Sequence, residues 1–418
     1  MNSRERVSAA LAHRQPDRAP LDLGASAVTG MNVNSVYLLR QALQLDPPGT
    51  PVKVVEPFQM LGEIAPDLLD ALGVDVLSLG KPTTMFGFRN EGWQPWSFNG
   101  TPVLVPAGFN TIPEPDGSIL MYPDGDHSVP PSGKMPAGGY YFDSLIRQPP
   151  IDDDKLDPAD NLEEFEPISA ADLAHVKSEA ERLTTQTDKA LLANFGGTAF
   201  GDIALVPGPW MKHPKGIRDV AEWYMSTVSR RDYVYRVFEK QCEIGLANLA
   251  RVHEVVGERA AAVFLTGADF GAQTGPFISP KSYRSLYMPF HKAVNAWVHQ
   301  NTGWKTFIHS CGSVAALIPS FIEAGFDVLN PVQTSASGMD PRWLKQTFGA
   351  EFTFWGGGVD TQKTLPFGTP DQVRAEVKER IEIFGQGGGF VFNPIHNIQA
   401  GTPVENLQAL FAAVREYR

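Results

Sequence analysis

The chain lacks most features of secreted, membrane-bound and nucleic-acid-binding proteins. Its 418 residues include only two cysteines, Cys242 and Cys311, too few for the disulfide framework of a secreted domain. No apolar run approaches the roughly 20 residues that span a bilayer, and residues 1–7 are typical of an amphipathic helix start rather than a signal peptide. The net charge of −12, without a long basic run, disfavours nucleic acid and anionic membranes as partners. We therefore expect a cytoplasmic protein.

What the sequence does contain is a regular alternation of strand-like and helix-like segments. With 43% hydrophobic and 20% charged residues, the composition is that of a globular protein with a real core. Apolar runs predict strands at Asp75–Leu79, Leu191–Phe195, Ala262–Thr266, Lys305–His309, Asp327–Asn330, Phe352–Trp355 and Phe390–Phe392. Helical patterns separate the later runs and close the chain, at Ser279–Gln300, Val314–Ala324, Pro341–Phe348, Pro370–Phe384 and Pro403–Tyr417. This order predicts a parallel sheet in a (β/α)₈ TIM barrel. A doubly wound sheet is the alternative, but no Gly-x-Gly-x-x-Gly follows an early strand.

Residues 83–150 differ in composition from the rest of the chain. They are rich in Gly, Pro and aromatic residues, and they contain the turn dipeptides Asp116-Gly117 and Asp124-Gly125. We interpret this segment as short strands and hairpins inserted into, or leading up to, the barrel. Residues 1–418 are then expected to form a single domain, and a homodimer is compatible with the sequence.

A histidine and a cysteine two residues apart end one of the predicted strands. Residues i and i+2 of a strand point to the same side, so His309 and Cys311 should project together at a carboxyl-terminal strand end. Imidazole and thiolate are both good zinc ligands. The alternative reading is that both residues only pack in the core, as we expect for Cys242 within a helix.

Further polar residues follow other predicted strands, and in a barrel these ends meet at one mouth. His396 follows the last strand and would supply a third metal ligand, with Asp269 as the alternative. A thiolate donor favours zinc over magnesium or calcium. Asp269, Gln273 and Asp360 are candidate catalytic residues, and Asn194, Asn330 and Gln333 are candidate substrate-binding residues. Each of them taken alone is also explained as a cap or a turn residue.

Several of these segments together resemble a known family. The uroporphyrinogen decarboxylase superfamily has similar sequences at residues 16–24, 72–76, 267–273, 279–283, 309–312, 325–327 and 355–362. The resemblance spans nearly the whole chain. It implies a single (β/α)₈ barrel with its active site at the carboxyl-terminal mouth.

Within that superfamily, the His-x-Cys motif resembles the corrinoid-dependent methyltransferase branch. In that branch a histidine and two cysteines hold a zinc that activates a thiol acceptor for the methyl group of a methylcorrinoid protein. His309 and Cys311 match the first two ligands, whereas His396 occupies approximately the region of the absent second cysteine. Two histidines and one thiolate would make the zinc a better Lewis acid and a poorer activator of a bound thiolate.

Two further features of the sequence bear on this choice of branch. The decarboxylases carry an arginine-rich segment near the N-terminus that binds the carboxylates of the porphyrinogen, and here that region offers only Arg18. The Asp-x-His-x-x-Gly pattern of corrinoid-binding domains is absent, so any cobalamin would arrive on a separate protein.

The sequence therefore supports three hypotheses. The first is a zinc-dependent methyltransferase that moves a methyl group between a small substrate and a corrinoid protein. The second is a lyase or decarboxylase acting on a small carboxylic acid. If this acid is aromatic, the aromatic residues between Trp93 and Phe142 could line its pocket. The third is a barrel that only binds a ligand. Metal analysis followed by treatment with methylcobalamin would separate them.

Overall fold

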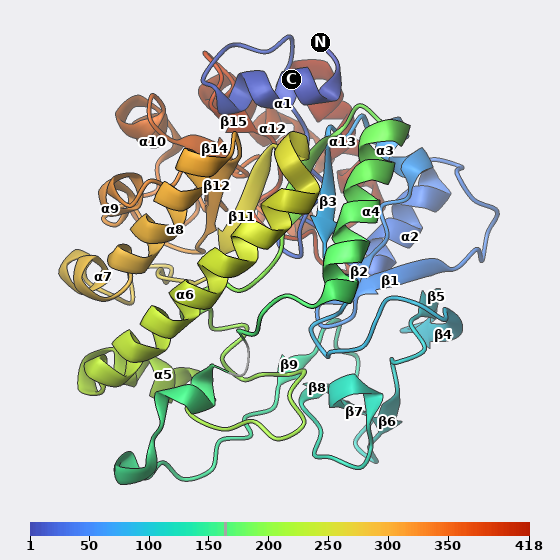
Figure 1. Cartoon of the computed structure of the whole chain (residues 1–418). Helices are drawn as coiled ribbons and strands as arrows, with labels where there is room; N and C mark the ends of the chain where they lie inside the picture. Colours follow the sequence, from blue (N-terminus) through green and yellow to red (C-terminus); the bar gives the residue numbers. More distant parts are fainter. Residues whose placement is uncertain (163–164) are drawn as a thin grey trace.

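A parallel sheet of seven strands forms the centre of the molecule (Figure 1). In the computed structural model, which describes residues 1–162 and 165–418, each strand pairs in parallel with the next one along the chain. The strands are β3 (Val76–Gly80), β10 (Ala190–Asn194), β11 (Ala262–Thr266), β12 (Lys305–His309), β13 (Val328–Asn330), β14 (Thr353–Trp355) and β15 (Phe390–Val391). These bounds lie within one residue of those predicted, so the α/β class and the strand positions are confirmed.

Residues 20–22 join the two edges of this sheet. The amide of Asp22 donates to the carbonyl of Phe392 at 2.9 Å, and the amide of Phe392 donates to Pro20 at 2.8 Å. On the other side, the amide of Asp75 donates to the carbonyl of Leu21 at 2.8 Å. This short segment therefore lies between β15 and β3 and closes the sheet into a ring.

Helices cover the outside of the sheet. They include α4 (Ala170–Gln186), α6 (Arg231–Val256), α8 (Met288–Asn301), α10 (Pro341–Phe348), α12 (Pro370–Phe384) and α13 (Val404–Tyr417). The helix predicted over residues 279–300 is two helices, α7 (Pro280–Leu286) and α8, because Pro289 has no amide hydrogen to continue the first one. The helix predicted at 314–324 is shorter, α9 (Ile318–Glu323), with Pro319 in its first turn.

The remaining elements are short. The helices are α1 (Ser3–Leu11), α2 (Val33–Ala42), α3 (Pro66–Leu72), α5 (Val220–Ser229) and α11 (Thr364–Phe367). Two small sheets are formed by β1 (Val52–Glu56), β2 (Leu61–Gly62), β4 (Gln94–Phe98) and β5 (Thr101–Val105), and by β6 (Thr111–Pro113), β7 (Ile119–Met121), β8 (Gly133–Met135) and β9 (Asp143–Ser144). Within the two described ranges, no helix combines the length and the hydropathy needed to cross a bilayer.

The segment 83–150 consists of short antiparallel strands, as expected. Strands β4–β9 lie beyond the end of the sheet toward which β3 runs (Figure 1). That this segment is an insertion into the barrel stays a prediction. Its position places it beside the carboxyl-terminal mouth.

Two layers of apolar side chains form the core. The larger layer fills the space between strands and helices, and the smaller one fills the inside of the ring. Phe307 and Trp355 belong to the inner layer, where Val7 and Leu11 of α1 also pack. His309 has the same strand parity as Phe307, so its side chain points to the inside of the barrel.

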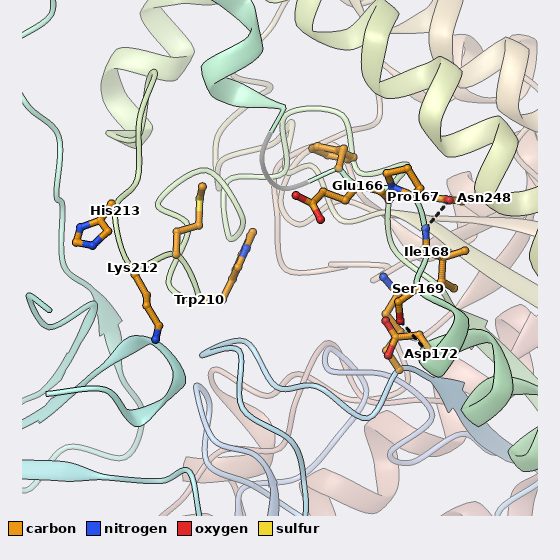
Figure 2. A pocket seen from close by; sticks show the side chains of 13 residues that line it. Glu166, Pro167, Ile168, Ser169, Asp172, Trp210, Lys212, His213 and Asn248 are labelled. Carbon is orange, nitrogen blue, oxygen red and sulfur yellow. Dashed lines mark hydrogen bonds between the residues drawn. The ribbon is translucent and has the colours of Figure 1, made fainter. Parts of the chain in front are cut away.

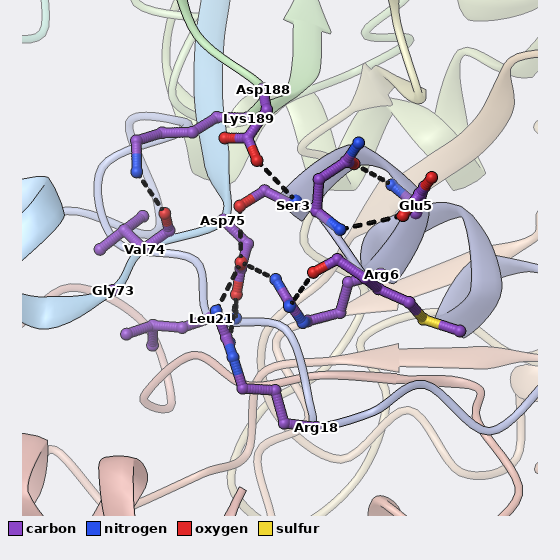
Figure 3. A network of polar contacts seen from close by, with 12 residues as sticks. Ser3, Glu5, Arg6, Arg18, Leu21, Gly73, Val74, Asp75, Asp188 and Lys189 are labelled. Atoms are coloured by element: carbon purple, nitrogen blue, oxygen red, sulfur yellow. Dashed lines mark hydrogen bonds and ion pairs between the residues drawn. The ribbon is translucent and has the colours of Figure 1, made fainter.

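The opposite end of the barrel carries a buried ion network around Asp75, which directly precedes β3 (Figure 3). The Asp75 carboxylate accepts hydrogen bonds from both terminal nitrogens of Arg18 at 2.7 and 2.9 Å and from Arg6 at 2.7 Å. It also accepts from the Ser3 hydroxyl at 2.8 Å and from the amide of Leu21 at 2.9 Å. One fully buried carboxylate thus ties α1 and the closing segment to β3.

Candidate metal centre

Six candidate residues lie at the carboxyl-terminal ends of successive strands. Asn194 ends β10, His309 ends β12 and Asn330 ends β13, while three others lie in the loops after β11, β14 and β15: Asp269, Asp360 and His396. Because all these strands are parallel, these residues share one edge of the sheet, as the sequence predicted.

His309, Cys311 and His396 form the tightest group at this edge. One ligand atom from each residue lies within 4.8 Å of the other two. The Cys311 sulfur is 3.4 Å from Nε2 of His309, and the two imidazole rings are 5.3 Å apart at an interplanar angle of 68°. Two nitrogen donors and one sulfur donor make a set that fits zinc, with a fourth position left for a ligand. The cluster predicted from the sequence is therefore brought together in space.

The loop that carries Cys311 depends on a glycine. Gly312 has φ = 81°, and a Cβ placed there would lie 2.4 Å from the carbonyl oxygen of Gly271. The side chain of Gln333 accepts a hydrogen bond from the amide of Gly312 at 2.7 Å. The turn after β12 thus needs a residue without a side chain, and Gln333 supports it from the neighbouring loop.

Asp269 lies beside the cluster without belonging to it. Its Oδ1 accepts a hydrogen bond from the amide of Cys311 at 2.6 Å, and its own carbonyl oxygen accepts from the hydroxyl of Tyr224 at 2.8 Å. Burial raises the pKa of Asp269. In this arrangement Asp269 anchors the backbone that presents the Cys311 thiol, and His396 remains the third member of the cluster.

His396 adopts an uncommon backbone conformation for a residue with a side chain. Its φ of 74° lies in the left-handed region, a strain of about 1–3 kcal/mol that folds tend to retain at functional sites. Its Nδ1 accepts a hydrogen bond from the amide of Asn397 at 2.8 Å. A neutral His396 ring therefore carries its proton at Nε2, which would have to leave before that nitrogen could bind a metal.

The electrostatics of the cluster favour uncharged side chains. Burial lowers the pKa of His309 to about 4 and that of His396 to about 3, so both rings are neutral near pH 7. Burial, followed by the charge of Asp269, raises the pKa of the Cys311 thiol. Burial, followed by the same charge, raises the pKa of Asp202 to about 7. A bound cation would favour the thiolate and the carboxylates, and it needs its imidazole ligands neutral.

Asp202 was not found from the sequence. It lies in the loop after β10, and a Cβ on Gly267 would lie only 2.6 Å from its Oδ2, so a glycine in the next strand's loop makes room for it. It is eight residues beyond the end of its strand, too far for the strand-end argument that identified Asn194. Tyr224, on α5, carried no sequence signal either.

The other predicted residues have varied surroundings. Asn194 and Gln273 are exposed, and Gln273 donates to the side chain of Gln362 at 3.5 Å. Asp360 is buried and accepts from the amides of Gln362 and Lys363 at 2.7 and 3.1 Å, as a turn cap does. The buried Asn330 contacts His309, with 2.6 Å between Oδ1 and Nδ1. Whether these residues bind substrate or act in catalysis stays a prediction.

A separate cavity of about 540 Å³ lies at the same end of the barrel (Figure 2). It is bounded by residues 165–169 and Asp172 on one side and by residues 210–213 on the other, with Lys81 after β3 and Gly197 after β10. Among the described residues, its walls include none of the three cluster members. Its volume is within the usual range for small-molecule sites.

Comparison with known proteins finds the two groups that the sequence motifs resemble, uroporphyrinogen decarboxylases and corrinoid-dependent methyltransferases. The family model described as uroporphyrinogen decarboxylase (URO-D) matches residues 147–417. A uroporphyrinogen decarboxylase from Pseudoalteromonas atlantica is 24% identical over 207 residues, which is 47% of this chain and 56% of that protein. A methylcobamide:CoM methyltransferase, MtaA, from Methanosarcina barkeri is 30% identical over 166 residues, which is 38% of this chain and 44% of that protein. The matched segments thus span about half the length of these relatives.

A solved structure extends the likeness to the whole chain. A methyltransferase from Methanosarcina mazei aligns with a TM-score of 0.55 and 17% sequence identity, covering 100% of this chain and 99% of its own. At that identity the likeness shows the fold alone.

Proposed function

The chain belongs to the uroporphyrinogen decarboxylase family, and from this premise we propose that it is a zinc-dependent methyltransferase. It would move a methyl group between a small methylated substrate or acceptor and a corrinoid protein. The observation that carries the proposal is the cluster of His309, Cys311 and His396 at the barrel mouth. The name of the Methanosarcina barkeri relative, a methylcobamide:CoM methyltransferase, supports the corrinoid partner.

Each residue of the site has a proposed role. His309, Cys311 and His396 would hold the zinc, which when bound supplies Lewis acidity that polarises or deprotonates the methyl acceptor, or polarises a methoxy donor. The carboxylate of Asp269 holds the backbone of Cys311 in place by accepting a hydrogen bond from the Cys311 amide. Gln273 and Asp360 would orient the substrate together with Asn194 and Gln333.

Arg18 argues against the alternative function, a lyase or decarboxylase of a small carboxylic acid. Arg18 is the one arginine that the sequence offered near the N-terminus for binding carboxylates, and both its terminal nitrogens donate to Asp75. Asp75 precedes β3, whereas the cluster follows β12, so Arg18 lies at the opposite end of the barrel.

Two measurements on the purified protein test the proposal. Elemental analysis should find about one zinc per chain. Incubation with methylcobalamin and a small thiol should then give the methyl thioether and demethylated cobalamin, at a rate that falls at least about 100-fold in Cys311→Ser. Zinc-free protein that transfers methyl groups normally would refute the zinc centre. Release of CO₂ from small aromatic acids without any methyl transfer would favour the lyase.

A further inference from the structure

A buried chain of hydrogen bonds connects the ends of three neighbouring strands. Nδ1 of His309, at the end of β12, lies 2.6 Å from Oδ1 of Asn330 at the end of β13. Nδ2 of Asn330 donates to the carbonyl oxygen of Trp355, at the end of β14, at 2.8 Å. We propose that Asn330 is a positioning residue that fixes the tautomer and orientation of the His309 ring for metal binding, rather than a substrate-binding residue.

The carbonyl oxygen of Trp355, at the end of this chain of hydrogen bonds, sets the direction in which each bond is donated. A backbone carbonyl can only accept a hydrogen bond, so the amide group of Asn330 must turn its NH₂ toward Trp355. Its oxygen then faces His309, and an amide oxygen also only accepts. Nδ1 of His309 must therefore carry the proton, and the lone pair of the neutral ring is on Nε2.

The lone pair of Nε2 is on the side where the cluster lies. Nε2 of His309 is the atom that contacts the Cys311 sulfur at 3.4 Å. The neutral ring thus presents a nitrogen lone pair that can bind a metal beside the thiol, without any rearrangement. His396 is held in the opposite tautomer, with its proton on Nε2, because its Nδ1 accepts a hydrogen bond from the amide of Asn397. Of the two histidines, His309 is the one already prepared as a ligand.

Asn330 is well held for this role. It is completely buried, and its backbone carbonyl accepts from the amide of Ser310 at 2.7 Å, next to His309. The β12–β13 register places His309 and Asn330 side by side. A side chain enclosed in this way cannot reach a substrate at the open mouth. Partners of this kind typically change metal affinity by 10- to 100-fold when they are removed.

The test combines two readouts, of which the first needs no metal. Long-range ¹⁵N–¹H NMR of the metal-free protein at about pH 8, where histidines are neutral, reports which nitrogen of each ring carries the proton. The second readout is zinc affinity, measured by competition with a chromophoric chelator. Asn330→Leu removes the acceptor at similar size. Asn330→Asp keeps an oxygen facing the ring but loses the NH₂ group that donates to Trp355. His13 is the internal control, because its Nδ1 contacts the carbonyl of Gly349 at 3.1 Å, far from the cluster in sequence.

We expect the proton of His309 on Nδ1 in the wild type and in Asn330→Asp, and a mixture of tautomers in Asn330→Leu. Zinc affinity should fall about 10- to 100-fold in Asn330→Leu and should fall less in Asn330→Asp, which keeps the acceptor for the ring. A wild-type His309 protonated on Nε2 would overturn the inference. So would an unchanged tautomer and affinity in an Asn330→Leu protein whose His13 signal is native.

The metal part of this inference rests on the proposed function, and the two can fail separately. A wild-type protein with the proton on Nδ1 of His309 but no affinity for zinc would refute the zinc centre. It would still support the proposal that Asn330 fixes the tautomer of the His309 ring. If Asn330→Leu does not fold, the wild-type and Asn330→Asp spectra still decide the direction of the chain.

Discussion

The carboxylate of Asp269 accepts a hydrogen bond from the backbone amide of Cys311 at 2.6 Å, across two neighbouring strand ends. The contact joins the loops after β11 and β12 at the point where the metal cluster forms. Asp269 was the alternative third ligand from the sequence. We propose that it supports the ligand loop instead, because its carboxylate binds the backbone of that loop.

Replacing Asp269 should therefore weaken metal binding by way of the backbone. Asp269→Ala removes the acceptor, and we expect zinc affinity to fall roughly 10- to 100-fold. Asp269→Asn keeps an oxygen for the amide of Cys311 and should lose much less. Competition with a chelator measures both. Equal losses in the two variants would mean that the charge of Asp269, and not its hydrogen bond, matters to the site.

His396→Ala distinguishes a metal ligand from a substrate contact. If His396 completes the site, zinc affinity and methyl transfer should fall together, the affinity by at least about 100-fold. The exposed His127, whose ring contacts the carbonyl of Asn110, serves as a matched control in His127→Ala. A His396→Ala protein that keeps its full zinc content but turns over slowly would assign the imidazole to the substrate, and Asp269 would be the next residue to test as a ligand.

The Asp75 network should stabilise the fold without affecting the metal. Asp75→Asn leaves the mostly buried Arg6 and Arg18 without their shared charge, so we expect a loss of about 3 kcal/mol in the free energy of unfolding. Asp17→Asn removes a carboxylate that is 41% exposed and should lose less than about 1 kcal/mol. Urea unfolding measures both variants. Zinc content should stay at the wild-type level. A loss of zinc from folded Asp75→Asn protein would show that the Asp75 network and the metal cluster, at opposite ends of the barrel, are not independent.

Asp22 should make stability depend on pH. Burial raises the pKa of Asp22 to about 7, although the indole of Trp355 donates a hydrogen bond to it. Its pKa in the unfolded chain is about 3.9, so the native state binds this proton more tightly, and stability falls as pH rises between about 4 and 7. The full effect is at most about 4 kcal/mol.

Asp22→Asn should remove this pH dependence. Unfolding free energies at about pH 5 and about pH 8 should therefore differ less in the variant than in the wild type. The change with pH is the readout, because it is insensitive to a uniform loss of stability. Identical pH slopes would show that Asp22 is ionised in the native state at both pH values.

The sequence predicted well what depends on local patterns. Apolar runs such as Lys305–His309 located the strands, and the i, i+2 spacing placed His309 and Cys311 on one side of the chain. Contacts over long separations were not predictable. The link from His309 to Asn330 crosses 21 positions and depends on the β12–β13 register, so Asn330 appeared only as a polar strand end. The closing segment at residues 20–22 is too short to carry a strand pattern.

The zinc stoichiometry of two cysteine variants tests most directly whether His309, Cys311 and His396 form a zinc centre. Cys242 is buried on α6, where burial raises its pKa to about 11, and it serves as the matched control. We predict about one zinc per chain in the wild type and in Cys242→Ser, and a sharp loss in Cys311→Ser. Equal zinc content in the two variants, or full occupancy in Cys311→Ser, would contradict the assignment.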